Sequence, residues 1–215
     1  IPQGAMNSLN PVMRIDKQLV DGMIDHGVVM SKSERQDRVN ELLEMVDLAP
    51  KVASMYPHEL SGGMKQRVCV AMSIAMEPDM VIADEPTSAL DVVIQRQVME
   101  TIDRLQTDLG LAVILIGHDM GLMAQTVNRL AVMYAGKLME VGETEDMFYE
   151  PLHPYTELLI SSLPVLENKG VFSGIPGITP SLLTPPPGCV FHTRCPKAWD
   201  LCQKEIPQFT EVEPG

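Results

Sequence analysis

Two acidic residues close a short apolar run in the middle of the sequence. Asp84 and Glu85 directly follow residues 80–83, and such a run is typical of a strand buried on both faces. Carboxylates at the C-terminal edge of a parallel strand stand where α/β sheets bind ligands. In phosphoryl transfer the first acid organises Mg²⁺, and a following Glu can polarise the attacking water. On its own, this pair is equally consistent with solvated acids at a strand end.

A histidine follows the next apolar run along the chain. Residues 111–116 predict a second buried strand, and Gly117-His118-Asp119 comes directly after it. A neutral His at a strand edge can hydrogen-bond a γ-phosphate or the attacking water. The alternative is a histidine that satisfies loop carbonyl groups.

Residues 60–67 read LSGGMKQR. They contain a Ser-Gly-Gly turn at the start of a predicted helix. Ser61 followed by two glycines exposes backbone N–H groups at the positive end of the helix dipole, and such a turn can hold a phosphate. The alternative is an ordinary serine N-cap with flexible glycines.

The order of these features resembles the ABC ATPase family. The chain reads Gln3, then LSGGMKQR at 60–67, IADEPTSALD at 82–91, and then His118. The signature and the block that holds Walker B and the D-loop cover 18 positions at the expected spacing. The resemblance implies an ATPase that uses ATP and Mg²⁺.

The family's catalytic roles carry over to the matching positions. Gln3 is similar to the Q-loop glutamine, which contacts Mg²⁺ and water and relays to membrane subunits. Asp84 is similar to the Walker B metal residue, and Glu85 to the catalytic base. His118 is similar to the switch histidine, although Gly117 stands where many members have Thr.

The resemblance also implies a site shared between two ATPase subunits, which form a homodimer or a heterodimer. Asp91 lies in the D-loop, which crosses the dimer interface in the family. The signature residues are implied to bind the γ-phosphate of ATP held by the opposite subunit: Ser61, Gly62, Gly63 and Gln66.

The family's phosphate loop, GxxxxGK[ST], does not occur in this sequence. Family order puts this loop upstream of Gln3, together with the aromatic residue that stacks on adenine, so we expect a truncated chain. Without the backbone nest and the lysine, the β- and γ-phosphates lose most of their ligands. We therefore expect negligible ATPase activity from this chain alone. The rival interpretation is an inactive interaction module, against which the intact Asp84, Glu85 and His118 argue.

Buried strands that alternate with helices predict an α/β fold with a parallel sheet. Ser31 and Glu34 predict a capping box, and residues 130–134 and 137–141 predict paired strands. The resemblance implies a partial P-loop NTPase (RecA-like) core with an ABC helical subdomain and a Pro/Cys-rich extension. Residues 1–76 are expected to form the Q-loop and the helical subdomain, which ends in the signature helix. Residues 77–150 are expected to form the half of the core with Walker B, the D-loop and the switch histidine. Residues 151–215 are expected to form the extension.

Apolar residues also recur at helical spacing, and Gly110 closes one long predicted helix, residues 92–109. The signature helix is expected to carry one apolar stripe, made of Met64, Val68, Ala71, Met72 and Ala75.

The end of the chain resembles the C-terminal extension of dipeptide, oligopeptide and nickel importer ATPases. The matching motifs are HPYT at 153–156, IPG at 175–177, PGC at 187–189 and RCP at 194–196. The resemblance implies peptide import from the cytoplasmic face of the membrane, with permease subunits that dock on the helical subdomain and an external substrate-binding protein. Alternatives are import of nickel or another small solute, a soluble ABC protein of DNA repair or translation, and an inactive fragment.

Three cysteines in this extension, Cys189, Cys195 and Cys202, are separated by five and six residues. Some members of the subfamily bind a [4Fe–4S] cluster with four Cys, so a cluster is expected, with its fourth ligand beyond Gly215 or at His192. Zn²⁺ or structural thiols are the alternatives. Cys69 falls inside the signature helix and is expected in the core.

Bulk composition narrows the function classes further. The formal net charge of −13 argues against a broad nucleic-acid-binding face, because an acidic chain repels phosphate backbones. No apolar run reaches the roughly 18–20 residues that span a bilayer. No signal peptide is recognised, so a link to the membrane is expected through a partner, and a metal site is favoured over disulfides.

Overall fold

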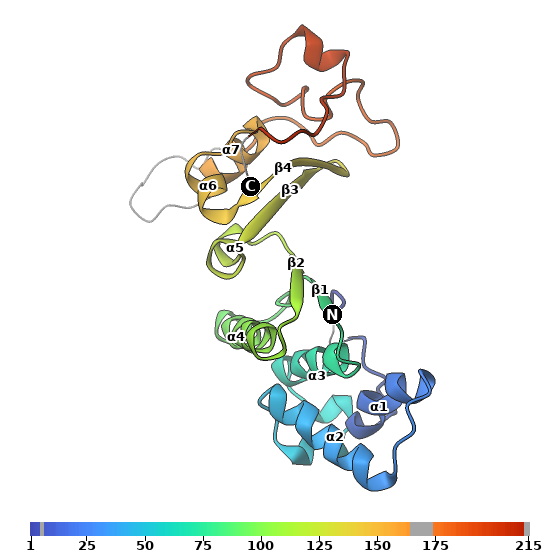
Figure 1. The fold of residues 1–215 in the computed structure, drawn as a ribbon. Helices are drawn as coiled ribbons and strands as arrows, with labels where there is room; N and C mark the ends of the chain where they lie inside the picture. Colours follow the sequence, from blue (N-terminus) through green and yellow to red (C-terminus); the bar gives the residue numbers. More distant parts are fainter. Residues whose placement is uncertain (5–6, 164–173, 213–215) are drawn as a thin grey trace. The chain divides into compact units, whose positions relative to one another are not determined.

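The computed structural model describes residues 1–4, 7–163 and 174–212, which form two compact units, Ile1–His118 and Asp119–Gly215 (Figure 1). The first unit contains, in order, α1 (Ile15–Asp25), α2 (Lys32–Met45), the 3₁₀ helices η2 (Pro50–Ser54) and η3 (Pro57–Glu59), α3 (Gly62–Ile74), β1 (Met80–Asp84), α4 (Val92–Leu109) and β2 (Ala112–Ile116). The second contains α5 (Met120–Thr126), β3 (Arg129–Tyr134), β4 (Lys137–Glu143), α6 (Thr144–Tyr149), α7 (Pro154–Ser161) and η4 (Asp200–Gln203). The division at residues 76 and 150 that the family implies stays a prediction.

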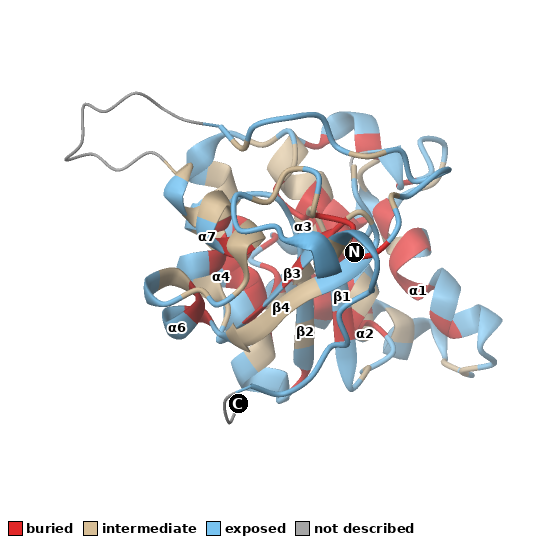
Figure 2. Cartoon of the chain, turned by 90° about the horizontal axis from the view of Figure 1, so that it is seen from above, coloured by how far each residue is buried: buried red, intermediate tan, exposed pale blue. Residues whose placement is uncertain are grey.

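Local sequence signals set the helix ends of the first unit. The predicted capping box is confirmed, because Glu34 N donates to Ser31 Oγ and Ser31 N donates to Glu34 Oε2. Gly110 closes α4 in the left-handed conformation, with φ of 65°. Figure 2 shows buried residues, in red, along α1, α3 and α4.

The apolar stripe predicted on α3 is wrong at one position. Met72 is 37% exposed, whereas the consecutive residues 68–71 are all buried. Four buried residues in a row cover a full turn. The helix is thus covered on most sides, and Met72 falls on the side that remains open. Cys69 is buried in α3, as expected.

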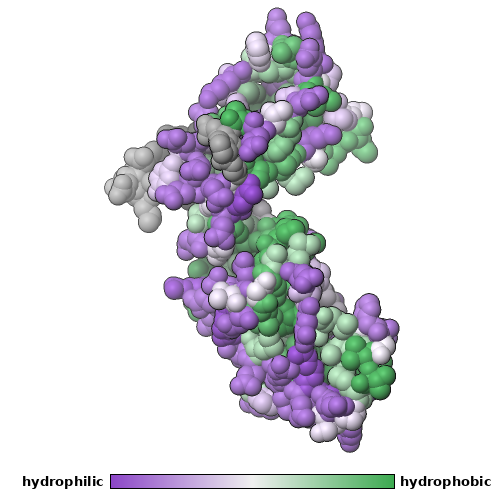
Figure 3. Space-filling view, in the orientation of Figure 1, coloured by the Kyte–Doolittle hydropathy of each residue, from purple (hydrophilic) through white to green (hydrophobic). Residues whose placement is uncertain are grey.

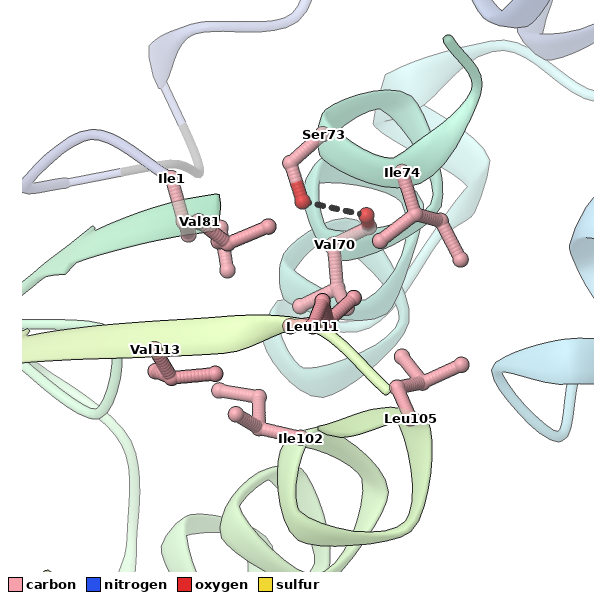
Figure 4. Close-up of a pocket in the computed structure, with 9 residues that line it drawn as sticks. All are labelled: Ile1, Val70, Ser73, Ile74, Val81, Ile102, Leu105, Leu111 and Val113. Carbon is pink, nitrogen blue, oxygen red and sulfur yellow. Dashed lines mark hydrogen bonds between the residues drawn. The ribbon is translucent and has the colours of Figure 1, made fainter. Parts of the chain in front are cut away.

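The two strands of the first unit run parallel, as predicted, in a register that sets Met80 opposite Ala112 and Asp84 opposite Ile116. Ile1 also bonds to β1, because Ile1 N donates to the Ile82 carbonyl and the Ile1 carbonyl accepts from Asp84 N. One face of this sheet packs on α3 and α4, where apolar side chains surround a small pocket (Figure 4).

Burial of these strands on both faces, which the apolar runs predict, is wrong for the described residues. Four side chains of the opposite face are between 46% and 49% exposed: Met80, Ile82, Ile114 and Ile116. Within the described ranges α3 and α4 both lie on the other face, so hydrophobic residues reach the surface around β1 and β2 (Figure 3).

The second unit is built on an antiparallel hairpin. β3 and β4 pair from Arg129↔Glu143 to Tyr134↔Lys137, which confirms the predicted paired strands. Its turn, Ala135-Gly136, has positive φ at both residues, 49° and 75°. The extension contributes Val190 and Phe191 to a small buried cluster with Tyr134. None of the helices that the structure describes is long and apolar enough to span a bilayer.

Candidate active site

The end of β1 places Glu85 beside the end of β2. The Glu85 amide donates to the Ile116 carbonyl at 2.9 Å, so the backbone of Glu85 is fixed to the neighbouring strand. Glu85 has φ of 44°, a left-handed conformation that is uncommon for a residue other than glycine. This turn directs the chain away from the sheet directly after Asp84, and it leaves the Glu85 side chain 25% exposed.

Two residues from distant parts of the sequence meet the Glu85 carboxylate. Gln3 Nε2 donates to Glu85 Oε2 at 2.7 Å. His118 Nδ1 lies 3.3 Å from Glu85 Oε1, and its side chain is 82% exposed. Both oxygens of one carboxylate therefore have a partner, and we call Gln3, Glu85 and His118 the carboxylate trio.

Asp84 lies next to the trio and is half-buried. Because strand side chains alternate, Asp84 shares the sheet face of Met80 and Ile82 rather than the face packed on α3 and α4. Within the described residues, no group of three or more His, Cys, Asp and Glu side chains could hold a metal ion by itself. Mg²⁺ is usually held by one or two carboxylates together with substrate phosphates. Asp84 and the amide oxygen of Gln3 fit the few ligands that a protein supplies to such a Mg²⁺ ion.

The predicted signature forms the N-terminus of α3. Ser61 is the N-cap, and its hydroxyl accepts from Met64 N at 3.3 Å. A Cβ atom on Gly63 would come 2.6 Å from Ile94 Cγ2 on α4, so glycine is needed where these helices approach. Gln66 is 3% exposed, and its Nε2 atom has no hydrogen-bond partner in the described ranges. Gln66 is thus placed inside the unit and not at the exposed helix tip.

Asp91, the predicted D-loop residue, has a visible structural role as the N-cap of α4. Its carboxylate accepts from Ile94 N at 3.0 Å, while the Asp91 residue itself is exposed. The turn before it contains Ala89 with φ of 61°. The structure thus brings Gln3, Glu85 and His118 into contact, whereas in the described part of the chain neither Asp91 nor the signature residues hydrogen-bond to the trio.

Sequence reasoning missed the contacts that fix α4 beside the helical part of the unit. Arg104 holds Asp47 through two bonds, Nη1 to Oδ1 at 3.0 Å and Nη2 to Oδ2 at 2.9 Å. Arg104 Nη2 also donates to the Met45 carbonyl. The hydrogen bond with Asp47 raises the pKa of Arg104. An acid and a base 57 residues apart carry no sequence signal that pairs them.

The three cysteines of the extension do not form a ligand set. A backbone hydrogen bond from Cys189 N to Cys202 O closes this segment, and His192 Nδ1 lies 2.7 Å from the Cys189 carbonyl. All three thiols are free, yet no metal-binding group is found among the described residues. Burial raises the pKa of Cys195, and negative charge on the other two thiols would raise it further. The described residues therefore give no support to the expected [4Fe–4S] cluster or to the Zn²⁺ alternative.

Arg194 fixes part of the extension by hydrogen bonds, in the segment where the sequence predicts a metal site. Arg194 donates to the carbonyl groups of Ile175 and Pro176, each at 2.8 Å. It also donates to the Tyr134 hydroxyl at 3.2 Å, and its guanidinium lies over the Tyr134 ring. These contacts fasten the residues before the cysteines to strand β3. The IPG and RCP motifs thus have a structural reason to occur together.

Comparisons with known proteins agree with the ABC ATPase motifs and with the extension. A family model described as "ABC transporter" matches residues 1–88. A second, described as "Oligopeptide/dipeptide transporter, C-terminal region", matches residues 139–202. The chain is 43% identical over 211 residues to the dipeptide transport ATP-binding protein DppD of Bacillus subtilis, which covers 97% of the chain and 63% of DppD. It is 43% identical over 216 residues to the oligopeptide transport ATP-binding protein OppD of Salmonella typhimurium, which covers 99% and 64%.

A Brucella ovis protein named for peptide import ATP-binding, BOV_A0347, is 41% identical over 215 residues, which cover 99% of the chain and 68% of that protein. The chain thus spans slightly less than two thirds of DppD and OppD. Among solved structures, CbiO1 of Clostridium perfringens, part of the ABC transporter complex CbiONQ, has a TM-score of 0.61 at 26% identity. The match covers 68% of this chain and 57% of CbiO1. The dimeric bacterial ABC transporter cassette MJ0796 has a TM-score of 0.56 at 28% identity and covers 66% and 60%.

Proposed function

The chain belongs to the ATP-binding proteins of ABC transporters, in the oligopeptide and dipeptide group, and we propose that its complete protein hydrolyses ATP to drive peptide import. The observation that carries this proposal is the carboxylate trio at the ends of β1 and β2. Its general base, Glu85, accepts bonds from two other residues that the family uses for the same reaction. A carboxylate held at such an edge is placed to accept a proton from an attacking water.

Each polar residue of the site has a distinct task in this proposal. Asp84 would hold the Mg²⁺ that accompanies the nucleotide, together with the amide oxygen of Gln3. Glu85 takes the proton of the attacking water. His118 orients the carboxylate through Oε1 and is exposed enough to reach a phosphate oxygen. When bound, ATP would supply the electrophilic γ-phosphorus and Mg²⁺ would neutralise negative charge on the phosphate groups.

The signature is proposed to act on a second ATPase subunit. Ser61, Gly62 and Gly63 begin a helix of 13 residues, whose N-terminal N–H groups and positive dipole end suit a phosphate. By the family pattern, the phosphate they bind belongs to a nucleotide held by another subunit. Asp91 is the exposed N-cap of α4. We propose that it faces the same interface.

The proposed partners follow the peptide-importer relatives. The protein would bind permease subunits at the cytoplasmic face of the membrane as a peripheral subunit, and an external binding protein would supply the peptide. Support comes from the match to the oligopeptide/dipeptide C-terminal region over residues 139–202. No iron–sulfur cluster is part of the proposal, because the described residues include no group that could hold a metal ion.

The test is ATP hydrolysis by the complete protein reconstituted with its permease and binding protein. We expect peptide to stimulate hydrolysis and to accumulate inside vesicles, and we expect the Glu85→Gln variant to abolish both. Hydrolysis that continues unchanged in Glu85→Gln would refute the assignment of the base. Hydrolysis that nickel stimulates and peptides leave unchanged would refute the peptide assignment alone. Residues 1–215 by themselves are expected to show no turnover above that of Glu85→Gln.

A further inference from the structure

Helix α7 of the second unit begins with a histidine cap. Its N-cap is His153, whose Nδ1 atom accepts from Tyr155 N at 3.0 Å. Four other described helices are capped by side-chain oxygens, at Ser31, Ser61, Asp91 and Asp119, which is the usual choice. An imidazole nitrogen accepts this bond only while it carries no proton, and histidine takes up its proton between pH 5 and 8. The cap of α7 therefore depends on pH where oxygen caps do not.

The chain that leads into α7 is held separately, by strand β4, which lies beside this helix (Figure 1). Both oxygens of Glu140 accept backbone amides, Oε1 from Leu152 N at 2.7 Å and Oε2 from His153 N at 3.1 Å. Pro154, the first residue of the helix, has no N–H group, so Tyr155 N is the first amide within it. Glu140 thus fixes the approach to α7, and the His153 ring satisfies the first amide inside it.

The surroundings of His153 disfavour its charged form. The residue is half-buried, and burial lowers the pKa of His153, while the negative charge of Glu140 raises it by less. The N-cap also lies at the positive end of the α7 dipole, where a cation is unfavourable. A proton on Nδ1 would in addition point at the Tyr155 N–H, donor against donor. Protonation therefore costs the folded helix its cap.

Other ionisable side chains of this unit lie around the same cluster. The neighbouring elements contribute Tyr134 on β3, Glu140 on β4, Tyr155 and Glu157 on α7, and Cys189, His192, Arg194, Cys195 and Lys197 on the extension. Burial raises the pKa of Tyr155 and of Cys195, so acid leaves both groups neutral. His192 Nδ1 lies 2.7 Å from the Cys189 carbonyl. Because His192 is a second histidine, the experiments below include variants that remove His153 alone.

The first turn of α7 is also where this helix holds the extension. Phe191 is fully buried, and its ring lies 5.1 Å from the Tyr155 ring and 6.1 Å from the His153 ring. Lys197 Nζ donates to Glu157 Oε2 in the same turn. The other attachment of the extension, from Arg194 to the Tyr134 hydroxyl on β3, does not involve α7. Loss of the cap at His153 therefore affects one of two attachments.

Acid is expected to weaken the attachment at α7. The pKa of His153 lies below its ordinary value of 6.5 in the folded chain, so the unfolded segment takes up the proton first as the pH falls. The stabilising contribution of the cap is complete above about pH 6.5, and it is lost as the pH falls through the lower folded value.

We propose that His153 is a pH-sensitive latch: a proton taken up at Nδ1 releases Tyr155 N, loosens the first turn of α7 and frees Phe191 from that turn, while Arg194 keeps the extension on β3. The proposal is independent of the proposed function, because none of these residues belongs to the carboxylate trio. It gives the HPYT motif a task outside ATP chemistry. His153 supplies the cap, Pro154 begins the helix, and Tyr155 supplies both the capped amide and a ring against Phe191.

The first experiment follows the Tyr155 amide by hydrogen exchange in the complete protein. Each rate is divided by the rate of an unstructured amide at the same pH, which removes the direct effect of pH on exchange. We expect the protection of Tyr155 to fall about fivefold between pH 7.5 and 5.5, as for one lost hydrogen bond. Protection that stays constant over this range would overturn the proposal.

The matched control is His153→Asn, which keeps an acceptor oxygen near the place of Nδ1 but takes up no proton. Its protection at Tyr155 should change by less than about twofold over the same range, because Asn is a usual N-cap. His153→Ser serves if His153→Asn does not fold. An equal fall in the variant and in the wild type would assign the effect to another group, such as His192, and would overturn the role of His153.

The second experiment measures the attachment of the extension by NMR. Nuclear Overhauser effects between the rings of Phe191 and Tyr155 report the contact with α7, and those between Phe191 and Tyr134, 5.1 Å apart, report the contact with β3. In the wild type we expect the first to weaken at least about twofold at pH 5.5 and the second to remain, and in His153→Asn we expect both to remain. An unchanged contact with Tyr155, or equal loss of both contacts, would overturn a latch at α7.

Discussion

The carboxylate trio and the three cysteines of the extension are both sets of polar residues that the sequence points to, yet the two sets assemble differently. Gln3, Glu85 and His118 meet because parallel strands end at one edge, and a backbone bond from Glu85 to Ile116 fixes that edge. The cysteines lie in a segment whose described regular structure is one 3₁₀ turn, η4. Regular strands position side chains across long sequence separations, whereas the described part of this irregular segment holds no group of three potential metal ligands.

The largest expected effect separates these two regions by activity. His118→Ala in the complete protein should lower kcat by about 10²-fold or more, because a group that orients the base is lost. Cys195→Ser should leave kcat within about twofold, because no step uses the thiol. Steady-state ATPase assays of both variants, beside the wild type, measure this contrast. A large loss in Cys195→Ser would mean that the extension contributes to turnover.

Substitution of Arg194 should destabilise the extension, whereas a chelator added to the wild type should not. Arg194→Ala leaves the carbonyl groups of Ile175 and Pro176 without their donor, at a cost of about 2–3 kcal/mol. We expect faster limited proteolysis near residues 175–202, followed by mass spectrometry. A chelator added to the wild type should not change the cleavage pattern. Cleavage that a chelator induces in the wild type would show that a metal holds this segment.

Gly63 of the signature should be needed for helix packing, whereas Gly22 on α1 should not. Gly63→Ala brings a Cβ atom within 2.6 Å of Ile94 Cγ2, and the free energy of unfolding should fall by about 1–3 kcal/mol. Gly22→Ala meets open space in a helix and should raise it by about 0.5–1 kcal/mol. Urea unfolding of both variants tests this, and equal effects would contradict the close helix approach.

The smallest expected effects concern the thiols themselves. Burial raises the pKa of Cys69 from 9.0 to about 11. The unfolded chain therefore loses this proton first as the pH rises, so the stability contribution is complete below pH 9 and is lost towards pH 11. Thermal unfolding at pH 8 and 10 should show a smaller decrease in Tm for Cys69→Ala than for the wild type. The same decrease in both would assign the alkaline loss to other groups.

Local sequence signals predict much of this fold correctly, because each needs few residues. The cap at Ser31 depends on four consecutive residues, and the turn at Gly136 on two. Burial of β1 on both faces is predicted wrongly, since the cover of a strand depends on chain that is distant in sequence. The order of motifs brings Gln3, Glu85 and His118 to attention, but not the bonds between them.

Other contacts leave no trace in the sequence. Gln18 bonds to backbone atoms alone, and no residue pattern encodes their positions. The left-handed backbone of Glu85, with φ of 44°, carries no signal in the sequence either. The predicted cluster is without support for a different reason: the cysteines have suitable chemistry, but no group of three potential ligands that could hold a metal ion occurs among the described residues.

One structure would test the central claim most directly: the complete protein with the Glu85→Gln substitution, solved with Mg²⁺ and ATP. The account predicts Mg²⁺ beside Asp84, the γ-phosphate within reach of His118, and the side chain at position 85 facing a water in line with that phosphate. A γ-phosphate bound away from the ends of β1 and β2 would contradict it, and the carboxylate trio would then have to be explained as a structural contact.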